Sequence, residues 1–189
     1  LGLQSEDFGS EWSRLVRDVF DTELMHGMAM DILSETLSDD LLDHAADFYA
    51  SDLGQRLVAV ENKAHMAEDD GLKAESGAAI VAGLERIGSP RLETLRRLNV
   101  ASDVEEISVR AIQEVQIRFL LAAAGAGVIE LQMEEPDLRE AMRAQADELG
   151  AQIAANALAN AAYTYQSFSD DDLLAYAEAL EHPEMQQVY

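Results

Sequence analysis

Apolar residues recur at intervals of three and four along nearly the whole chain, which is the spacing of one face of an α-helix. The run from about Thr22 to Leu37 shows this spacing with Leu24, Met28 and Ile32. β-branched and aromatic residues are sparse, prolines number only three, and we find no convincing strand. The pattern therefore predicts an all-α protein, a single helical domain over residues 1–189 with about eight helices.

Cap and turn residues set the expected helix boundaries, because serine, glycine and proline each favour a particular helix end. The longest predicted helices run from Ser102 or Asp103 to about Ile129, and from Pro136 through Tyr165. The small residues at 122–127 predict a close crossing with another helix. Other residues that we expect at helix ends are Ser10, Ser38, Ser51, Gly88 and Ser89-Pro90.

One segment of the chain occurs twice. Residues 37–57 read LSDDLLDHAADFYASDLGQRL and residues 168–189 read FSDDDLLAYAEALEHPEMQQVY; we call them the first and second DDLL segments. At a constant offset of 132, Asp39-Asp40-Leu41-Leu42 aligns with Asp171-Asp172-Leu173-Leu174, and Phe48 aligns with Leu180. The duplication predicts an internal pseudo-repeat of a helical hairpin, near residues 37–68 and again near 168–189, packed on the long central helices.

The second hairpin is shorter than the first. The first continues past Leu57 as a full helix, whereas Glu184 to Tyr189 gives barely one turn, which is marginal alone. We therefore expect the natural protein to continue beyond Tyr189. The chain starts at Leu1 without methionine, so either a leader has been removed or the chain has been trimmed.

The charge of the chain excludes some classes of partner. The 37 acidic and 13 basic side chains give a formal charge of −24, which repels phosphate backbones and anionic lipid. We expect no nucleic-acid binding and no membrane insertion, since the longest charge-free apolar run, Phe119 to Ile129, is too short to span a bilayer. Cysteine is absent, so the chain forms neither disulfides nor thiolate metal sites.

Few residues have the spacing of a known catalytic or metal site. Glu23 and His26 have the Glu-x-x-His spacing of four-helix di-iron sites, but the second such motif is missing. Two more pairs, Asp40 with His44 and Glu61 with His65, are four apart and predict local charge pairs. An alternating ladder of i,i+4 ion pairs is predicted for Glu106, Arg110, Glu114 and Arg118. We nominate no catalytic, cofactor-binding or metal-ligating residue and expect no cofactor.

Methionine and aromatic residues form a further set. At helical spacing they predict ordinary core packing, with a hydrophobic groove for a peptide or lipid as the alternative. The set comprises Met25, Met28, Met30, Phe48, Tyr49 and Met66.

The first DDLL segment resembles the domain of unknown function 2059. The pattern is Leu37-Ser38-Asp39-Asp40-Leu41, followed by Phe48-Tyr49-Ala50-Ser51-Asp52-Leu53-Gly54-Gln55. Family members usually carry proline where this chain has Asp52; the second segment keeps His182-Pro183 but lacks the glycine. The resemblance implies an all-helical protein exported to the periplasm of Gram-negative bacteria behind a signal peptide. It supplies no catalytic residues.

These observations favour a non-catalytic protein with a protein-interaction or scaffolding role, whose partner is another protein or a second copy of this chain. Two alternatives stay open. One is a carrier that holds a small apolar ligand or peptide in an interhelical groove. The other is a hydrolase or metalloprotein that uses dispersed acids and His26.

Overall fold

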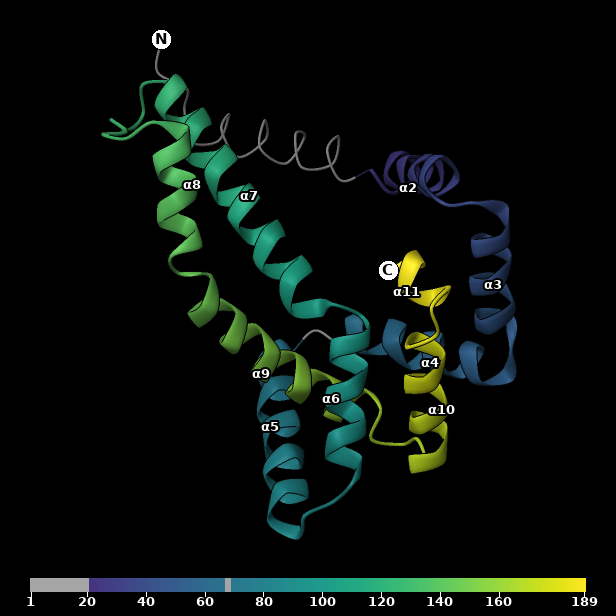
Figure 1. The fold of residues 1–189 in the computed structure, drawn as a ribbon. Helices are drawn as coiled ribbons and strands as arrows, with labels where there is room; N and C mark the ends of the chain where they lie inside the picture. The colour runs from purple at the N-terminus through teal and green to yellow at the C-terminus, as the bar shows by residue number, and fades with distance from the viewer. Residues whose placement is uncertain (1–20, 67–68) are drawn as a thin grey trace.

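The chain folds into an all-α domain, seen in a computed structural model that describes residues 21–66 and 69–189 (Figure 1). These residues form helices and connecting turns with no strand, which confirms the predicted fold class. The helix expected from Ser10 to Phe20 lies outside the described residues. The helices are α2 (Thr22–Thr36), α3 (Asp39–Ala50), α4 (Asp52–His65), α5 (Asp70–Ile87), α6 (Arg91–Ala101), α7 (Val104–Gly125), α8 (Glu135–Arg143), α9 (Ala146–Thr164), α10 (Asp170–Leu180) and α11 (Met185–Val188).

Helix α9 lies at the centre of the packing, against α5, α6 and α7. Its contact with α5 is close because Gly77 has no side chain: a Cβ atom there would collide with the backbone carbonyl of Ala159. Helix α10 packs along α6. Leucines from α4, α6 and α10 meet between these helices and form the main core together with Met185 of α11. The core residues below 4% exposure are Leu57, Leu95, Leu98, Ala162, Leu173, Ala177, Leu180 and Met185.

The close helix crossing predicted for residues 122–127 is not formed at Gly125 with any of the described residues. Among the described residues, no heavy atom outside the local backbone lies within 4 Å of a Cβ built on Gly125. Helix α7 ends at Gly125, and Gly127 takes a left-handed conformation with φ of 71°. The small residues therefore end a helix, since glycine adopts positive φ without steric cost.

The single helix predicted from Pro136 through Tyr165 is interrupted. Helix α8 ends at Arg143 and α9 begins at Ala146, with a tight turn in which the Gln145 N–H bonds to the Met142 carbonyl at 3.1 Å. The same carbonyl accepts a 2.8 Å hydrogen bond from the Gln113 side chain of α7. After the break, α8 lies along α7, whereas α9 takes a different direction, packs against α7 and crosses α5 (Figure 1). With α11, this raises the described helices to ten, against the eight or so expected.

The ion-pair ladder predicted on α7 is present at only one of its steps within the described residues. Arg118 bonds to Glu114 at 2.7 Å, and Glu114 also accepts a 2.8 Å bond from Arg139 of α8. These two guanidinium groups, Arg139 first, lower the pKa of Glu114 to about 2. The carboxylate thus joins α7 to α8 instead of pairing only along its own helix.

Both DDLL segments form a helix, a turn and a second helix: α3 with α4, and α10 with α11. The connections differ. Ser51 alone separates α3 from α4, in an extended conformation, whereas residues 181–184 separate α10 from α11. The duplication of the hairpin stays a prediction, because equal helix order does not by itself establish equal geometry.

Candidate functional site

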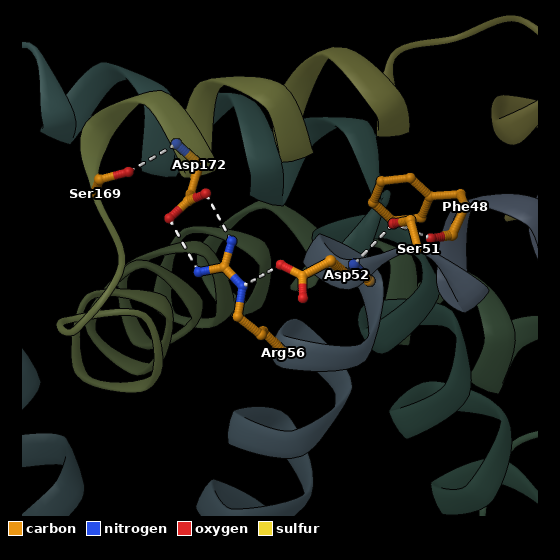
Figure 2. A network of polar contacts seen from close by, with 7 residues as sticks. Phe48, Ser51, Asp52, Arg56, Ser169 and Asp172 are labelled. Carbon is orange, nitrogen blue, oxygen red and sulfur yellow. Dashed lines mark hydrogen bonds and ion pairs between the residues drawn. The ribbon is translucent and has the colours of Figure 1, made fainter.

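The two DDLL segments meet at Arg56, as Figure 2 shows. Its guanidinium reaches from α4 to α10 and binds both carboxylate oxygens of Asp172, at 2.8 and 3.2 Å. A third contact joins Arg56 Nε to Asp52 at 3.2 Å, one turn earlier in α4. The hydrogen bond from Arg56 is the main cause that lowers the pKa of Asp172, and that carboxylate in turn raises the pKa of Arg56. The pair links α4 to α10 at the surface.

Tyrosine hydroxyls gather around Glu61 on the inner side of the same junction. Tyr165, the residue after α9, donates a 2.8 Å hydrogen bond to the Glu61 carboxylate, and Tyr176 of α10 donates one of 3.3 Å. The hydroxyls of Tyr49 and Tyr189 bond to each other. The Tyr176 ring stacks on Phe48 with the ring centroids 5.9 Å apart. Aromatic packing thus joins α3, α9 and α10 around one carboxylate.

These tyrosines are hydrogen-bond donors and not bases. Burial is the main cause that raises the pKa of Tyr49, Tyr165 and Tyr176, and the charge of Glu61 adds to the effect in all three. A raised pKa keeps the phenol protonated at neutral pH. The arrangement accordingly suits structural hydrogen bonding, and it does not activate a nucleophile or a general base.

A cleft of about 1030 Å³ lies beside the tyrosines, between α4, α5, α6, α9 and α10. Its wall is rich in polar groups, among them Glu61, Lys73, Asn156 and Asn160. A second cavity, of about 670 Å³, lies between α6, α7 and α9. Valines, alanines and Leu158 form most of its wall, and five charged residues lie among the others: Arg96, Asp103, Glu105, Glu106 and Asp147. The second cavity is the one whose lining suits an apolar ligand.

Two of the predicted local pairs do not form in the described residues. Glu61 accepts hydrogen bonds from tyrosines instead of pairing with His65. His44 turns away from Asp40 and pairs with Glu184, which follows α10. Glu23 and His26 lie on the exposed helix α2. The sequence offered no signal for the pairing of His44, because its partner stands 140 positions away.

Histidine and carboxylate side chains do come together at that point. His44, His182 and Glu184 each offer one ligand atom, and these three atoms lie within 4.8 Å of one another. Sequence reasoning listed both histidines but joined neither to Glu184. The sequence places His182 and Glu184 on either side of Pro183, but it does not place His44 beside them.

Helix α2 differs most from the predicted core, because its apolar residues are exposed. None of its residues is buried, and Leu24, Met28 and Ile32 are 54%, 55% and 56% exposed. Figure 1 shows α2 beyond the start of α3, outside the packed helices. Core packing of the methionine set is therefore wrong for Met25, Met28, Met30 and Met66, which are all at least 49% exposed.

The same helix lies in the part of the chain that comparison with protein families recognises. Residues 23–82 match DUF2059. The family is described as an uncharacterised protein conserved in bacteria, and the match confirms the resemblance of the first DDLL segment. The DUF2059 match spans roughly a third of the chain, from α2 into α5, and leaves out the second DDLL segment.

No curated protein and no solved structure matches the chain. In the described residues, no helix is long and apolar enough to cross a membrane. The DUF2059 match therefore stands as the one finding about relatives, and it carries no activity with it.

Proposed function

We propose that this protein acts through protein–protein contacts and that α2 is the helix it presents. The observation that supports the proposal is the exposure of the apolar side chains of α2. Leu24, Met28 and Ile32 recur at a spacing of four, so they form one stripe, and each is more than half exposed. Scattered exposed apolar residues are ordinary, whereas a continuous stripe is typical of a binding surface.

The charge of α2 indicates the chemistry of the partner. The helix contains Glu23, Asp31 and Glu35, is capped by Asp21, and has no lysine or arginine. A second copy of this chain would bring a second formal charge of −24 to the contact. An apolar groove bordered by basic residues complements both the stripe and the acids. The partner we propose is a different protein with such a groove.

Site-specific photo-crosslinking tests this proposal. A photoreactive residue replaces Met28 of α2 in one variant and Leu72 of α5 in a control; the native side chains are 55% and 59% exposed. The expected result is one protein crosslinked from position 28 and not from position 72. The purified partner should then bind the unmodified chain, lose affinity with added salt, and bind the Met28→Asp variant at least about tenfold more weakly.

Two results would contradict the proposal. One is equal crosslinking from positions 28 and 72. The other is a dimer of this chain that Met28→Asp dissociates, measured by light scattering on a sizing column, because the occupant of α2 would then be a second copy.

Location is part of the same proposal. We infer export to the periplasm from the resemblance of the first DDLL segment to DUF2059, which the match over residues 23–82 supports. Fractionation of cells that express the native gene checks it. Recovery of the protein with cytoplasmic markers would refute export.

A carrier role is the second candidate, and the cavity of about 670 Å³ between α6, α7 and α9 favours it. Cavities of this volume hold drug-sized molecules. Ala154 lines the cavity, whereas Ala151 of the same helix does not and is exposed. A neutral naphthylamine fluorophore should bind the unmodified chain and Ala151→Trp, but not Ala154→Trp. Equal binding by all three would exclude this cavity as the site.

A further inference from the structure

We propose that His44, His182 and Glu184 form a binding site for a borderline divalent transition-metal ion, with Zn²⁺ as the reference ion. The three residues come from opposite ends of the chain: His44 from α3, and the other two from the turn between α10 and α11. They meet because α11 packs on α3, held there by the buried side chain of Met185. The site therefore exists only in the folded protein.

The distances suit a single ion. His44 Nδ1 lies 3.2 Å from Glu184 Oε2, and His182 Nδ1 lies 3.6 Å from the same oxygen. In a tetrahedral zinc site with metal–ligand bonds of about 2.1 Å, neighbouring ligand atoms are about 3.4 Å apart. Two of the three ligand–ligand edges thus already match. The third is at most 4.8 Å long and closes when the imidazole rings rotate.

The two imidazoles have to turn before both can bind one ion. Their rings are stacked, with centroids 4.7 Å apart and planes inclined by 23°, whereas a metal binds in the plane of each ring. His182 Nδ1 accepts a 3.4 Å hydrogen bond from the backbone N–H of Glu184, so this nitrogen carries a lone pair, and a bound ion would replace that long hydrogen bond. Imidazole nitrogen must be unprotonated to bind a metal. Two stacked imidazoles beside one carboxylate supply such nitrogens together with a compensating negative charge.

The choice of metal follows from the ligands and their exposure. Imidazole suits Zn²⁺, Cu²⁺ and Ni²⁺, whereas Ca²⁺ and Mg²⁺ prefer a shell made entirely of oxygen. The side chains of His44, His182 and Glu184 are 28%, 50% and 51% exposed, which leaves room for water as a fourth ligand. A bound ion would link α3 to the α10–α11 turn, and so fasten the two DDLL segments together.

The test is a titration of the full chain with ZnCl₂ after chelator treatment and dialysis, followed by calorimetry near neutral pH. We expect one ion per chain. Each of His44→Asn, His182→Asn and Glu184→Gln should weaken binding at least about tenfold. The matched controls are His26→Asn and His65→Asn, which remove the two histidines outside the cluster and should leave the affinity unchanged.

Two further measurements separate metal binding from a structural role of the same residues. Zn²⁺ should raise the midpoint of thermal unfolding of the unmodified chain and of both controls, but not that of the three cluster variants. Electron paramagnetic resonance of the Cu²⁺ form should show two coordinated nitrogens, and one in either cluster histidine variant. Circular dichroism in the presence of chelator verifies that each variant is folded. If a histidine variant does not fold, Glu184→Gln still tests the site, because the Glu184 side chain is half-exposed and its replacement should not disturb the fold.

The proposal is overturned if Zn²⁺ does not bind, or if binding persists in the double variant His44→Asn with His182→Asn. It is also overturned if the control variants lose affinity equally, since the ion would then bind diffusely to the acidic surface. His44, His182 and Glu184 lie outside α2, and of the variants only the control His26→Asn lies on it, so the metal site can fail without the interaction role and the reverse.

Discussion

Helices α3 and α10 begin the two DDLL segments with the same apolar positions, yet they are buried to different depths. Leu173 and Leu180 of α10 are 0% and 2% exposed. The aligned Leu41 and Phe48 of α3 are only half-buried, and no residue of α3 is fully buried. The cause is the neighbourhood: α10 lies along α6 in the core, while α3 lies at the edge, against α4 and α11 (Figure 1). The apolar pattern thus determines which face of a helix turns towards the protein. The neighbouring helices determine how much of the apolar surface on that face is buried.

The largest expected effect comes from truncating the aligned leucines. Leu173→Ala should cost about 3 kcal/mol of unfolding free energy, because it empties a fully enclosed site. Leu41→Ala should cost about 1 kcal/mol, since a half-buried side chain gives up less apolar contact on truncation. Urea denaturation followed by circular dichroism measures both. Equal losses would show that burial depth does not separate the two segments.

A smaller loss of stability is expected from a substitution in the tight turn between α3 and α4, which only the first DDLL segment has. A Cβ on Gly54 would lie 2.6 Å from Tyr49 Cα and would also meet the Phe48 carbonyl oxygen, so Gly54→Ala should cost about 2 kcal/mol. The second segment has Gln186 at the aligned position, which rules out the same close approach there.

Gly83→Ala is the matched control, because a Cβ there meets no atom of the described residues within 4 Å. The Gly83→Ala variant should be more stable by about 0.5 kcal/mol. Position 83 lies inside α5, and alanine leaves the unfolded chain fewer backbone conformations than glycine does. Thermal unfolding of both glycine variants distinguishes steric overlap from a general effect of alanine.

The N-terminal cap of α10 is also better formed than that of α3. Ser169 Oγ accepts a 3.1 Å hydrogen bond from the Asp172 N–H, whereas Ser38 makes no such side-chain bond. Ser169→Ala should cost about 1 kcal/mol. Ser38→Ala should cost well under half of that, measured by the same denaturation. A larger loss at Ser38 would mean that its hydroxyl caps α3 in solution.

The smallest effect concerns pH. Arg56 lowers the pKa of Asp172 below the 3.8 of a free side chain, so the folded protein binds this proton less readily than the unfolded chain. The stabilisation is present above pH 3.8 and disappears as the pH falls through the lower pKa of the folded state. Asp172→Asn should therefore destabilise the protein at neutral pH and lose its effect in acid.

Asp40→Asn is the control for the pH effect. Asp40 holds the aligned position of the first segment, is exposed, and forms no ion pair with another described residue. Its variant should show no comparable pH dependence in denaturation curves collected across the acidic range. A matching dependence would locate the effect in the acidic surface as a whole.

Much of the fold follows from local signals. Ser51 caps α4 through a 3.1 Å hydrogen bond from Gly54, Gly88 ends α5 with φ of 62°, and Pro90 precedes α6, all at positions expected from the sequence. Capping and turn preferences act over a few residues, so a single chain reveals them. The break between α8 and α9 has no proline or glycine to mark it. It lies where α8 packs along α7 and the following α9 packs against α5 and α6 as well.

The candidate sites were harder to foresee. Glu61 was expected to pair along its own helix, but Tyr165 and Tyr176 approach it from more than a hundred positions away. The apolar stripe on α2 has the same spacing as the apolar stripes of the buried helices. It differs from them only because α2 lies outside the packed helices. Periodicity reports amphipathicity, and it does not report whether a covering surface exists.

By itself the sequence determined the helical class, most helix ends, the acidic charge and the resemblance of the first DDLL segment to DUF2059. These depend on backbone preferences and composition, which are properties of neighbouring residues. The tertiary structure decided that α10 is buried while α3 stays at the edge, that α2 stays exposed, and that His44 meets His182 and Glu184. Those outcomes depend on which helices lie side by side, and contacts between distant residues leave no periodic trace in a single chain.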